Sequence, residues 1–125
     1  MRSRSPSPER RRFPSSLIAA AAAALAFVAA APMSATAADD AQMAEGRALF
    51  TGGATPPCAI CHTLKDAGAT GAVGPVLDDL RPDEARVAAA LRGGIGAMPS
   101  FAESLSDAQI RALAHYVAKA SGGSP

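Results

Sequence analysis

The chain of 125 residues is poor in the residues that fill or cross-link large domains. It has no tryptophan, one tyrosine, four phenylalanines and two cysteines. Two cysteines exclude a framework of several disulfide bonds, and the length excludes a large two-domain catalytic scaffold. The hydrophobic content of 49% contributes little to a core, because 32 of the hydrophobic residues are alanine, which buries little surface. We therefore expect one small domain with a thin core.

The chain also lacks a strong charge of either sign. Twelve Lys and Arg residues against 11 Asp and Glu residues give a formal net charge of +1 at pH 7. Proteins that bind nucleic acid usually carry a clustered basic face. We therefore expect no nucleic acid among the partners of this protein.

Residues 1–37 have the layout of a cleaved secretory signal peptide. Five arginines precede an uncharged, alanine-rich run from Leu17 to Ala31, and small residues follow up to Ala37, where we expect cleavage. An uncleaved membrane anchor is the alternative. The apolar run is, however, shorter than the ~20 residues that span a bilayer, so we expect no stable membrane insertion after cleavage.

Removal of this segment changes the character of the chain. The segment holds five of the 12 basic residues and one of the 11 acidic residues, so residues 38–125 carry a formal charge of −3. Only 19 large apolar side chains remain for these 88 residues, a poor supply at a size where cores become marginal. Something other than side chains should therefore help to fill the interior.

The rest of the sequence predicts an all-α fold with long loops. A first helix, capped by Asp39 or Asp40, should run to about Phe50. Pro82 and the acidic residues after it predict a second helix over 82–92. The segments 66–76 and 93–104 are too rich in small residues, Gly and Pro for regular structure.

The clearest helix signal lies near the C-terminus. Ser106 and Gln109 form a capping box, and Leu105 with Ile110 forms a hydrophobic staple. A helix from there to about Ala120 would place one apolar stripe on a single face, made of Ile110, Leu113, Tyr116 and Val117. We expect the folded domain to span residues 38–120 and residues 121–125 to form a disordered tail.

The motif that carries chemistry is Cys58-Ala59-Ile60-Cys61-His62. C-x-x-C-H is typical of c-type haem attachment, because two thiols one helical turn apart can each add to a haem vinyl group while the next residue offers an imidazole to the iron. A short helix would place Cys58, Cys61 and His62 on one face. A structural disulfide or a thioredoxin-type redox pair is the alternative, but neither accounts for His62. We expect one haem c, bound covalently through two thioethers.

A second axial ligand should come from far along the chain. Met98 lies in a loop between glycines and Pro99, which holds the loop rigid, and we expect it to bind the iron. His115 is the less favoured alternative, because it lies in the middle of a helix and should be partly exposed. Met43 lies on the first helix and should belong to the core.

With these motifs, the sequence resembles the class I c-type cytochromes over nearly all of residues 38–125. Five features carry the resemblance: Gly46 with Phe50, the C-x-x-C-H motif, Gly74-Pro75-x-Leu77, Met98-Pro99-Ser100-Phe101, and the stripe from Ile110 to Val117. The departure is the stretch from Asp66 to Val73, which is rich in Ala and Gly and has no aromatic residue to cover the haem edge.

The resemblance implies a cytochrome c fold of three to four helices around one covalent haem. It also implies that the Pro75 carbonyl accepts a hydrogen bond from His62 Nδ1, and that Leu77, Ile95 and Phe101 pack on the macrocycle. Such a protein is a periplasmic one-electron carrier and not an enzyme, and its partners are redox proteins: a dehydrogenase as donor, and an oxidase or another cytochrome as acceptor.

A second hypothesis concerns the redox partner. The stretches Cys61–Gly68 and Gly74–Leu80 are similar to the cytochrome partners of sulfite dehydrogenases. This similarity implies a dedicated cytochrome subunit of a periplasmic dehydrogenase, in place of a freely diffusing carrier.

Overall fold

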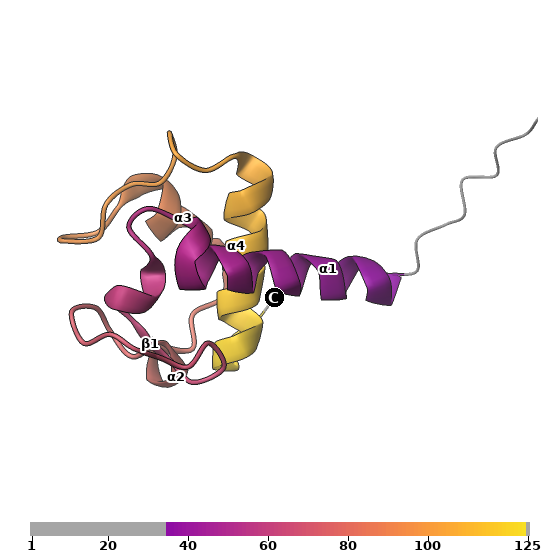
Figure 1. Ribbon diagram of the computed structural model, residues 1–125, viewed down its shortest axis with the longest axis horizontal. Helices are drawn as coiled ribbons and strands as arrows, with labels where there is room; N and C mark the ends of the chain where they lie inside the picture. Colours follow the sequence, from indigo (N-terminus) through magenta and orange to yellow (C-terminus); the bar gives the residue numbers. More distant parts are fainter. Residues whose placement is uncertain (1–34, 125) are drawn as a thin grey trace, which may run out of the picture. The chain divides into compact units, whose positions relative to one another are not determined.

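The computed structural model describes residues 35–124, which form a mostly helical domain (Figure 1). Most of the expected signal peptide and Pro125 lie outside the described residues. The all-α prediction is confirmed, apart from one pair of two-residue strands. The elements in chain order are α1 (Ala35–Ala48), a π-helical turn (Leu49–Gly53), a 3-10 turn (Cys58–Ile60), β1 (Thr63–Leu64), β2 (Ala69–Thr70), α2 (Leu77–Leu80), α3 (Glu84–Gly93) and α4 (Asp107–Ser121). No helix within residues 35–124 is both long and apolar enough to cross a membrane.

Helix α4 forms as its sequence predicts. The Ser106 hydroxyl accepts the Gln109 backbone N–H, and the Gln109 side chain accepts the Ser106 backbone N–H, which completes the capping box. The predicted stripe is buried in the core, as is Leu105 of the staple. Burial of this face is what stabilises the helix in the domain.

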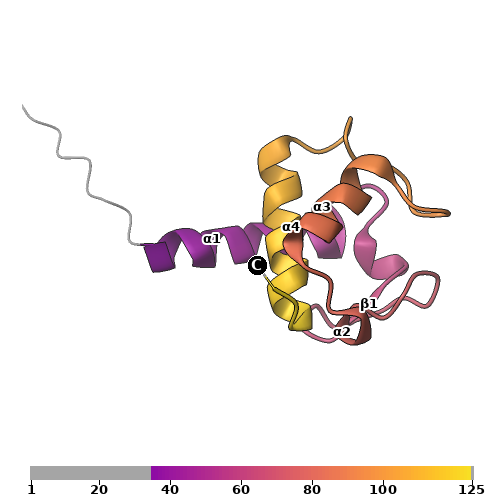
Figure 2. The ribbon, with the colours of Figure 1, turned by 180° about the vertical axis from the view of Figure 1, so that it is seen from behind.

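Helix α1 crosses α4 in close contact, as both views of the ribbon show (Figures 1 and 2). The crossing point is Gly46, where a Cβ atom would collide with the Ala112 carbonyl oxygen and with Tyr116. Phe50 lies one turn further on and packs edge-to-face on the Tyr116 ring, with 6.0 Å between ring centroids. The Gly46 and Phe50 pair thus places the two helices in direct contact.

The predicted start of the first helix is wrong. Within the described residues, helix α1 extends over Ala35–Ala48, and neither Asp39 nor Asp40 caps it, because both lie inside the helix. The Asp39 carboxylate instead contacts α4, at 2.7 Å from His115 Nε2 and 2.6 Å from Lys119 Nζ. Glu84 of α3 bonds to the other ring nitrogen of His115. His115 thus joins three helices.

Helix α3 begins two residues later than predicted. Asp83 is its N-cap, since the Asp83 carboxylate accepts the Arg86 backbone N–H at 2.7 Å. Pro82 precedes the cap and does not occupy the first helical position. The single turn of α2 was not predicted, and neither was the hairpin of β1 and β2, which pairs Thr63 with Thr70 and Leu64 with Ala69.

Long-range polar contacts hold this hairpin against the helices. The Tyr116 hydroxyl donates to the Asp66 carboxylate at 2.6 Å, and the Arg47 side chain donates to the Asp66 carbonyl at 2.9 Å. Burial, reinforced by the Asp66 carboxylate, raises the pKa of Tyr116, so its hydroxyl remains a donor. The turn at Asp66 is therefore joined to both crossing helices.

The expected disordered tail is wrong for residues 121–124. Ser121 is buried in the last turn of α4, and Gly122 ends the helix in the left-handed conformation, with φ 80°. The Gly123 N–H donates to the Ala118 carbonyl, and the Ser124 carbonyl accepts the Glu84 N–H. These bonds hold the end of the chain against the start of α3.

The contacts of Asp39 predict a pH-dependent contribution to stability. Hydrogen bonds from Lys119 and His115 hold the pKa of Asp39 below its ordinary value of 3.8. A lowered folded-state pKa stabilises the fold fully above pH 3.8, and this stabilisation is lost as the pH falls through the folded-state value. We expect Asp39→Asn to lower the melting temperature at neutral pH and to lose this effect in strong acid.

The matched control is Asp40→Asn on the exposed side of α1, because Asp40 makes no ion pair with any of residues 35–124. Thermal unfolding followed by circular dichroism across pH gives the comparison. Equal melting curves for the two variants at neutral pH would show that the contacts of Asp39 do not stabilise the fold.

Candidate functional site

An apolar cavity of about 410 Å³ lies between the helices and the two loops that carry the predicted site residues. Phe50, Leu113 and Val117, from the crossing of α1 and α4, form part of its wall. All eight predicted site residues line it, namely Cys58, Cys61, His62, Pro75, Leu77, Ile95, Met98 and Phe101. The fold therefore brings together side chains that are up to 43 positions apart in the sequence.

The motif Cys58–His62 reaches the cavity through a tight turn. The Cys58 carbonyl accepts the N–H groups of Cys61 and His62, at 3.1 and 2.9 Å. Both cysteines are free and half-buried in the cavity wall. The turn thus presents two thiols and one imidazole to the same space, as the spacing predicts.

Burial raises the pKa of the Cys58 thiol to about 11. A redox-active C-x-x-C pair works through a thiol whose pKa is lowered below the ordinary range. The shift at Cys58 has the opposite sign, because its surroundings disfavour the thiolate. This shift disfavours the thioredoxin-type alternative, and the sheet of residues 35–124 is only the two-stranded β1–β2 hairpin, without the β-α-β unit that such a motif accompanies.

The ring of His62 is held in one orientation. Its Nδ1–H donates to the Pro75 carbonyl at 3.0 Å, which is the hydrogen bond that the resemblance implies. The Gly74 N–H donates to the Cys61 carbonyl at 2.7 Å, and a Cβ atom at Gly74 would collide with the His62 ring. With Nδ1 protonated, Nε2 keeps its lone pair and is free to bind a metal ion.

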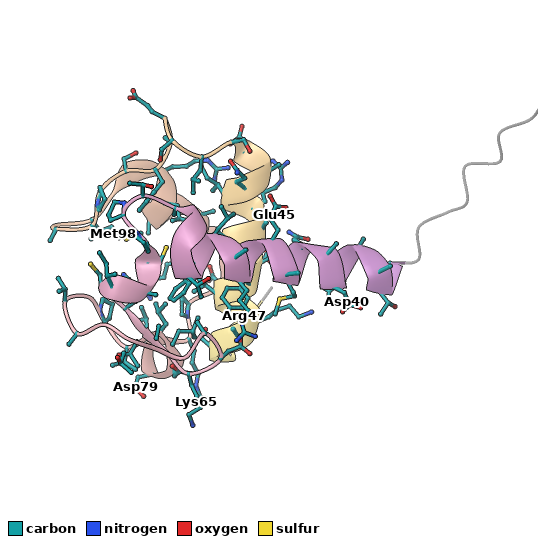
Figure 3. All side chains as sticks on the ribbon, viewed as in Figure 1. Asp40, Glu45, Arg47, Lys65, Asp79 and Met98 are labelled. Atoms are coloured by element: carbon teal, nitrogen blue, oxygen red, sulfur yellow. The ribbon has the colours of Figure 1, made fainter. Side chains whose placement is uncertain are left out.

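The loop of Met98 is fixed by backbone hydrogen bonds. Ile95 and Met98 exchange two of them, at 3.1 and 2.9 Å, and the Phe101 N–H donates to the Leu91 carbonyl at 2.7 Å. Gly94 and Gly96 adopt positive φ values, which glycine allows without strain. Met98 is half-buried on this loop (Figure 3) and lines the cavity.

The alternative ligands lie elsewhere. His115 is occupied by Asp39 and Glu84 and does not line the cavity. Met43 also lies outside the lining and packs against the core, as expected. Among residues 35–124, the structure therefore places one methionine sulfur and one histidine at the cavity.

Several parts of the wall were not identified from the sequence, and two of them are informative. The first is the face of α3 that contributes Arg86, Val87, Ala90 and Leu91. The members of the pairs 86/90 and 87/91 are one helical turn apart, so this spacing could have indicated that they share one face of the helix. The second is the stretch 66–73, where Val73, 74% exposed, lines the cavity edge in place of an aromatic residue.

The donor set fits a covalent haem c. Two thiols, an oriented imidazole and a thioether face one apolar cavity, and these are the protein groups that haem c attachment and axial ligation require. Leu77 and Phe101 are almost fully buried in the wall, whereas Ile95 is 66% exposed and lies at the rim.

The comparisons with known proteins agree with this chemistry. A family model described as cytochrome c oxidase, cbb3-type, subunit III matches residues 41–117, which include every predicted site residue. The solved structure of the c-type cytochrome SorU from Sinorhizobium meliloti is 47% identical, with a TM-score of 0.64. The match covers 68% of this chain and 97% of that one. No curated protein matches the chain.

The contact between Gly74 and the His62 ring predicts the effect of one methyl group. Gly74→Ala should displace the ring from the Pro75 carbonyl and destabilise the fold by about 1–3 kcal/mol, the usual cost of overpacking. Gly52→Ala is the control, because no non-neighbouring atom lies within 4 Å of a Cβ at that position. Denaturant unfolding measures both, and equal stability of the two variants would show that the ring is not confined at Gly74.

Proposed function

Since this chain belongs to the class I c-type cytochromes, we propose that it is a periplasmic one-electron carrier whose haem iron is bound by His62 and Met98. The observation that carries the proposal is that these two side chains line the same cavity as Cys58 and Cys61. A c-type cytochrome is an electron-transfer protein and has no catalytic site of its own.

Haem c is the cofactor of this family, and Cys58 and Cys61 are the residues that hold it through two thioethers. When bound, it supplies one reversible oxidation step between the ferrous and ferric states. The apolar wall, which includes Leu77, Phe101 and Leu113, excludes water from the site and keeps the local dielectric low.

His62 supplies the proximal nitrogen in this proposal. The Pro75 carbonyl holds the proton on Nδ1, so Nε2 would be available to the iron as a neutral donor. The same hydrogen bond increases the basicity of the imidazole and limits its rotation. His62 therefore stays in place when the iron changes its charge, which keeps the rearrangement on electron transfer small.

Met98 would supply a thioether sulfur to the iron. The hydrogen-bonded loop from Gly94 to Phe101 holds its backbone, so the thioether does not depend on a flexible segment. Thioether ligation raises the reduction potential relative to a second histidine. With nitrogen and sulfur both bound, no open position remains for oxygen or a substrate, which suits electron transfer.

Export to the periplasm rests on residues 1–37. Their basic start, apolar run and small residues before Ala38 support a cleaved signal peptide. Because the matched region begins at residue 41, cleavage after Ala37 would leave all of it intact.

Met98→Ala tests the axial ligand directly. We expect haem to stay attached, since the thioethers are unaffected, while the reduction potential falls and the reduced protein binds carbon monoxide. Visible spectroscopy, redox titration and haem staining on a denaturing gel measure these changes. Met43→Ala, which removes a methionine from α1 outside the cavity, is the control. An unchanged ferric spectrum of Met98→Ala would rule out Met98 as the ligand.

A dedicated subunit of a periplasmic dehydrogenase, such as a sulfite dehydrogenase, is the second candidate. It is supported by the similarity of Cys61–Gly68 and Gly74–Leu80 to the cytochrome partners of those enzymes. Exposed apolar side chains near the cavity, including Val73 and Ile95, provide a contact surface in either case.

Purification from native periplasm separates the two candidates. A free carrier should elute alone on size-exclusion chromatography at low ionic strength, because transient redox contacts are small. A dedicated subunit should elute together with a larger oxidoreductase at stoichiometric ratio, and that result would replace the free-carrier proposal by the second candidate.

A further inference from the structure

Arg86 is a charged side chain in an otherwise apolar cavity wall. It lies in the first turn of α3, and Val87, Ala90 and Leu91 of the same helix line the cavity beside it. Apart from the titratable His62 and the two cysteines, every other lining residue is apolar or glycine. The guanidinium is therefore the one fixed charge that the described residues bring to this wall.

The Arg86 side chain makes no hydrogen bond or ion pair with residues 35–124, although its backbone N–H donates to Asp83. Three other arginines of the domain are engaged: Arg47 bonds to Asp66, Arg81 to the Asp78 carbonyl, and Arg92 to Asp107. Arg111 also has no ion pair with residues 35–124, but it does not line the cavity. Arg86 is exposed and lines the cavity, so its five N–H donors are left without a partner among the described residues.

The cofactor of the proposed function brings matching groups. A haem carries two propionate carboxylates on one edge, and these anions need solvent or a cation where the macrocycle enters an apolar site. A guanidinium is the side chain best suited to a carboxylate, because its planar fork can donate two parallel hydrogen bonds.

No other charged side chain of the described residues lines this cavity. Asp78, Asp79 and Arg81 of the α2 segment do not line the cavity, and Asp78 accepts the Lys65 backbone N–H. Asp83 caps α3, and Glu84 bonds to His115. The loop 94–101 carries no charge.

We propose that Arg86 binds a haem propionate and keeps it ionised, and thereby controls how the reduction potential depends on pH. The inference rests on the haem c of the proposed function. An ionised propionate near the iron favours the ferric state and lowers the potential. Arg86 would confine this titration to low pH, because a neighbouring cation lowers the pKa of a carboxyl group by about 1–3 units.

Arg86→Gln tests the proposal in the mature holoprotein. Gln removes the charge and keeps part of the aliphatic stem, which itself covers apolar wall. Reduction potentials measured by spectroelectrochemistry across pH should show the pH-dependent step displaced upward by about 1–3 pH units. Above the step, the potential should be lower than in the wild type. Arg86→Lys should restore most of the wild-type curve, since an ammonium also compensates the carboxylate.

Arg111→Gln is the matched control, because it removes one positive charge from an exposed position on α4 that does not line the cavity. Superimposable curves for Arg86→Gln and Arg111→Gln would overturn the proposal and show that Arg86 is only solvated at the rim.

If Gln at position 86 prevents haem incorporation, Arg86→Met, with its longer apolar stem, should show the same upward displacement of the pH-dependent step. A purified wild-type protein without a c-type haem spectrum would instead refute the proposed function itself.

Discussion

The close crossing of α1 over α4 is the constraint on which the rest of the domain depends. It requires the absence of a side chain at Gly46, since any Cβ would collide with Ala112 and Tyr116. Phe50 and Leu113, which both belong to the buried core around this crossing, form part of the cavity wall. The crossing also turns the Tyr116 hydroxyl toward Asp66, and so holds the hairpin that follows His62. Both the core and the site therefore require a residue without a side chain at position 46.

The cavity explains the thin core. With few large apolar residues, the chain does not fill its own interior, and it builds a wall around a space lined by Leu77, Phe101 and Val117. A covalent, largely apolar macrocycle completes that interior, so the cofactor is both the redox centre and part of the core. Packing and function are coupled here, because the residues that stabilise the domain are those that exclude water from the iron.

The two histidines show how the surroundings assign different roles to the same side chain. His62 has one nitrogen bonded to a backbone carbonyl and the other free at an apolar cavity, an arrangement that suits a metal ligand. His115 has both nitrogens bonded to carboxylates and joins α1, α3 and α4. Arginines divide in the same way, since Arg92 is paired on the surface while Arg86 lines the cavity and has no ion-pair partner among residues 35–124.

The local features could be predicted from the order of the amino acids: the C-x-x-C-H turn, the rigid Met98 loop, the capping box at Ser106 and the apolar stripe of α4. Each depends on residues within about one or two helical turns, where spacing and backbone preference act directly. The hairpin at Asp66, the role of His115 and the place of Arg86 depend on how the helices and loops pack together. Their partners are distant in the chain, as Tyr116 is from Asp66 and Asp39 from His115. No local pattern encodes such a meeting, because it exists only once the helices have packed.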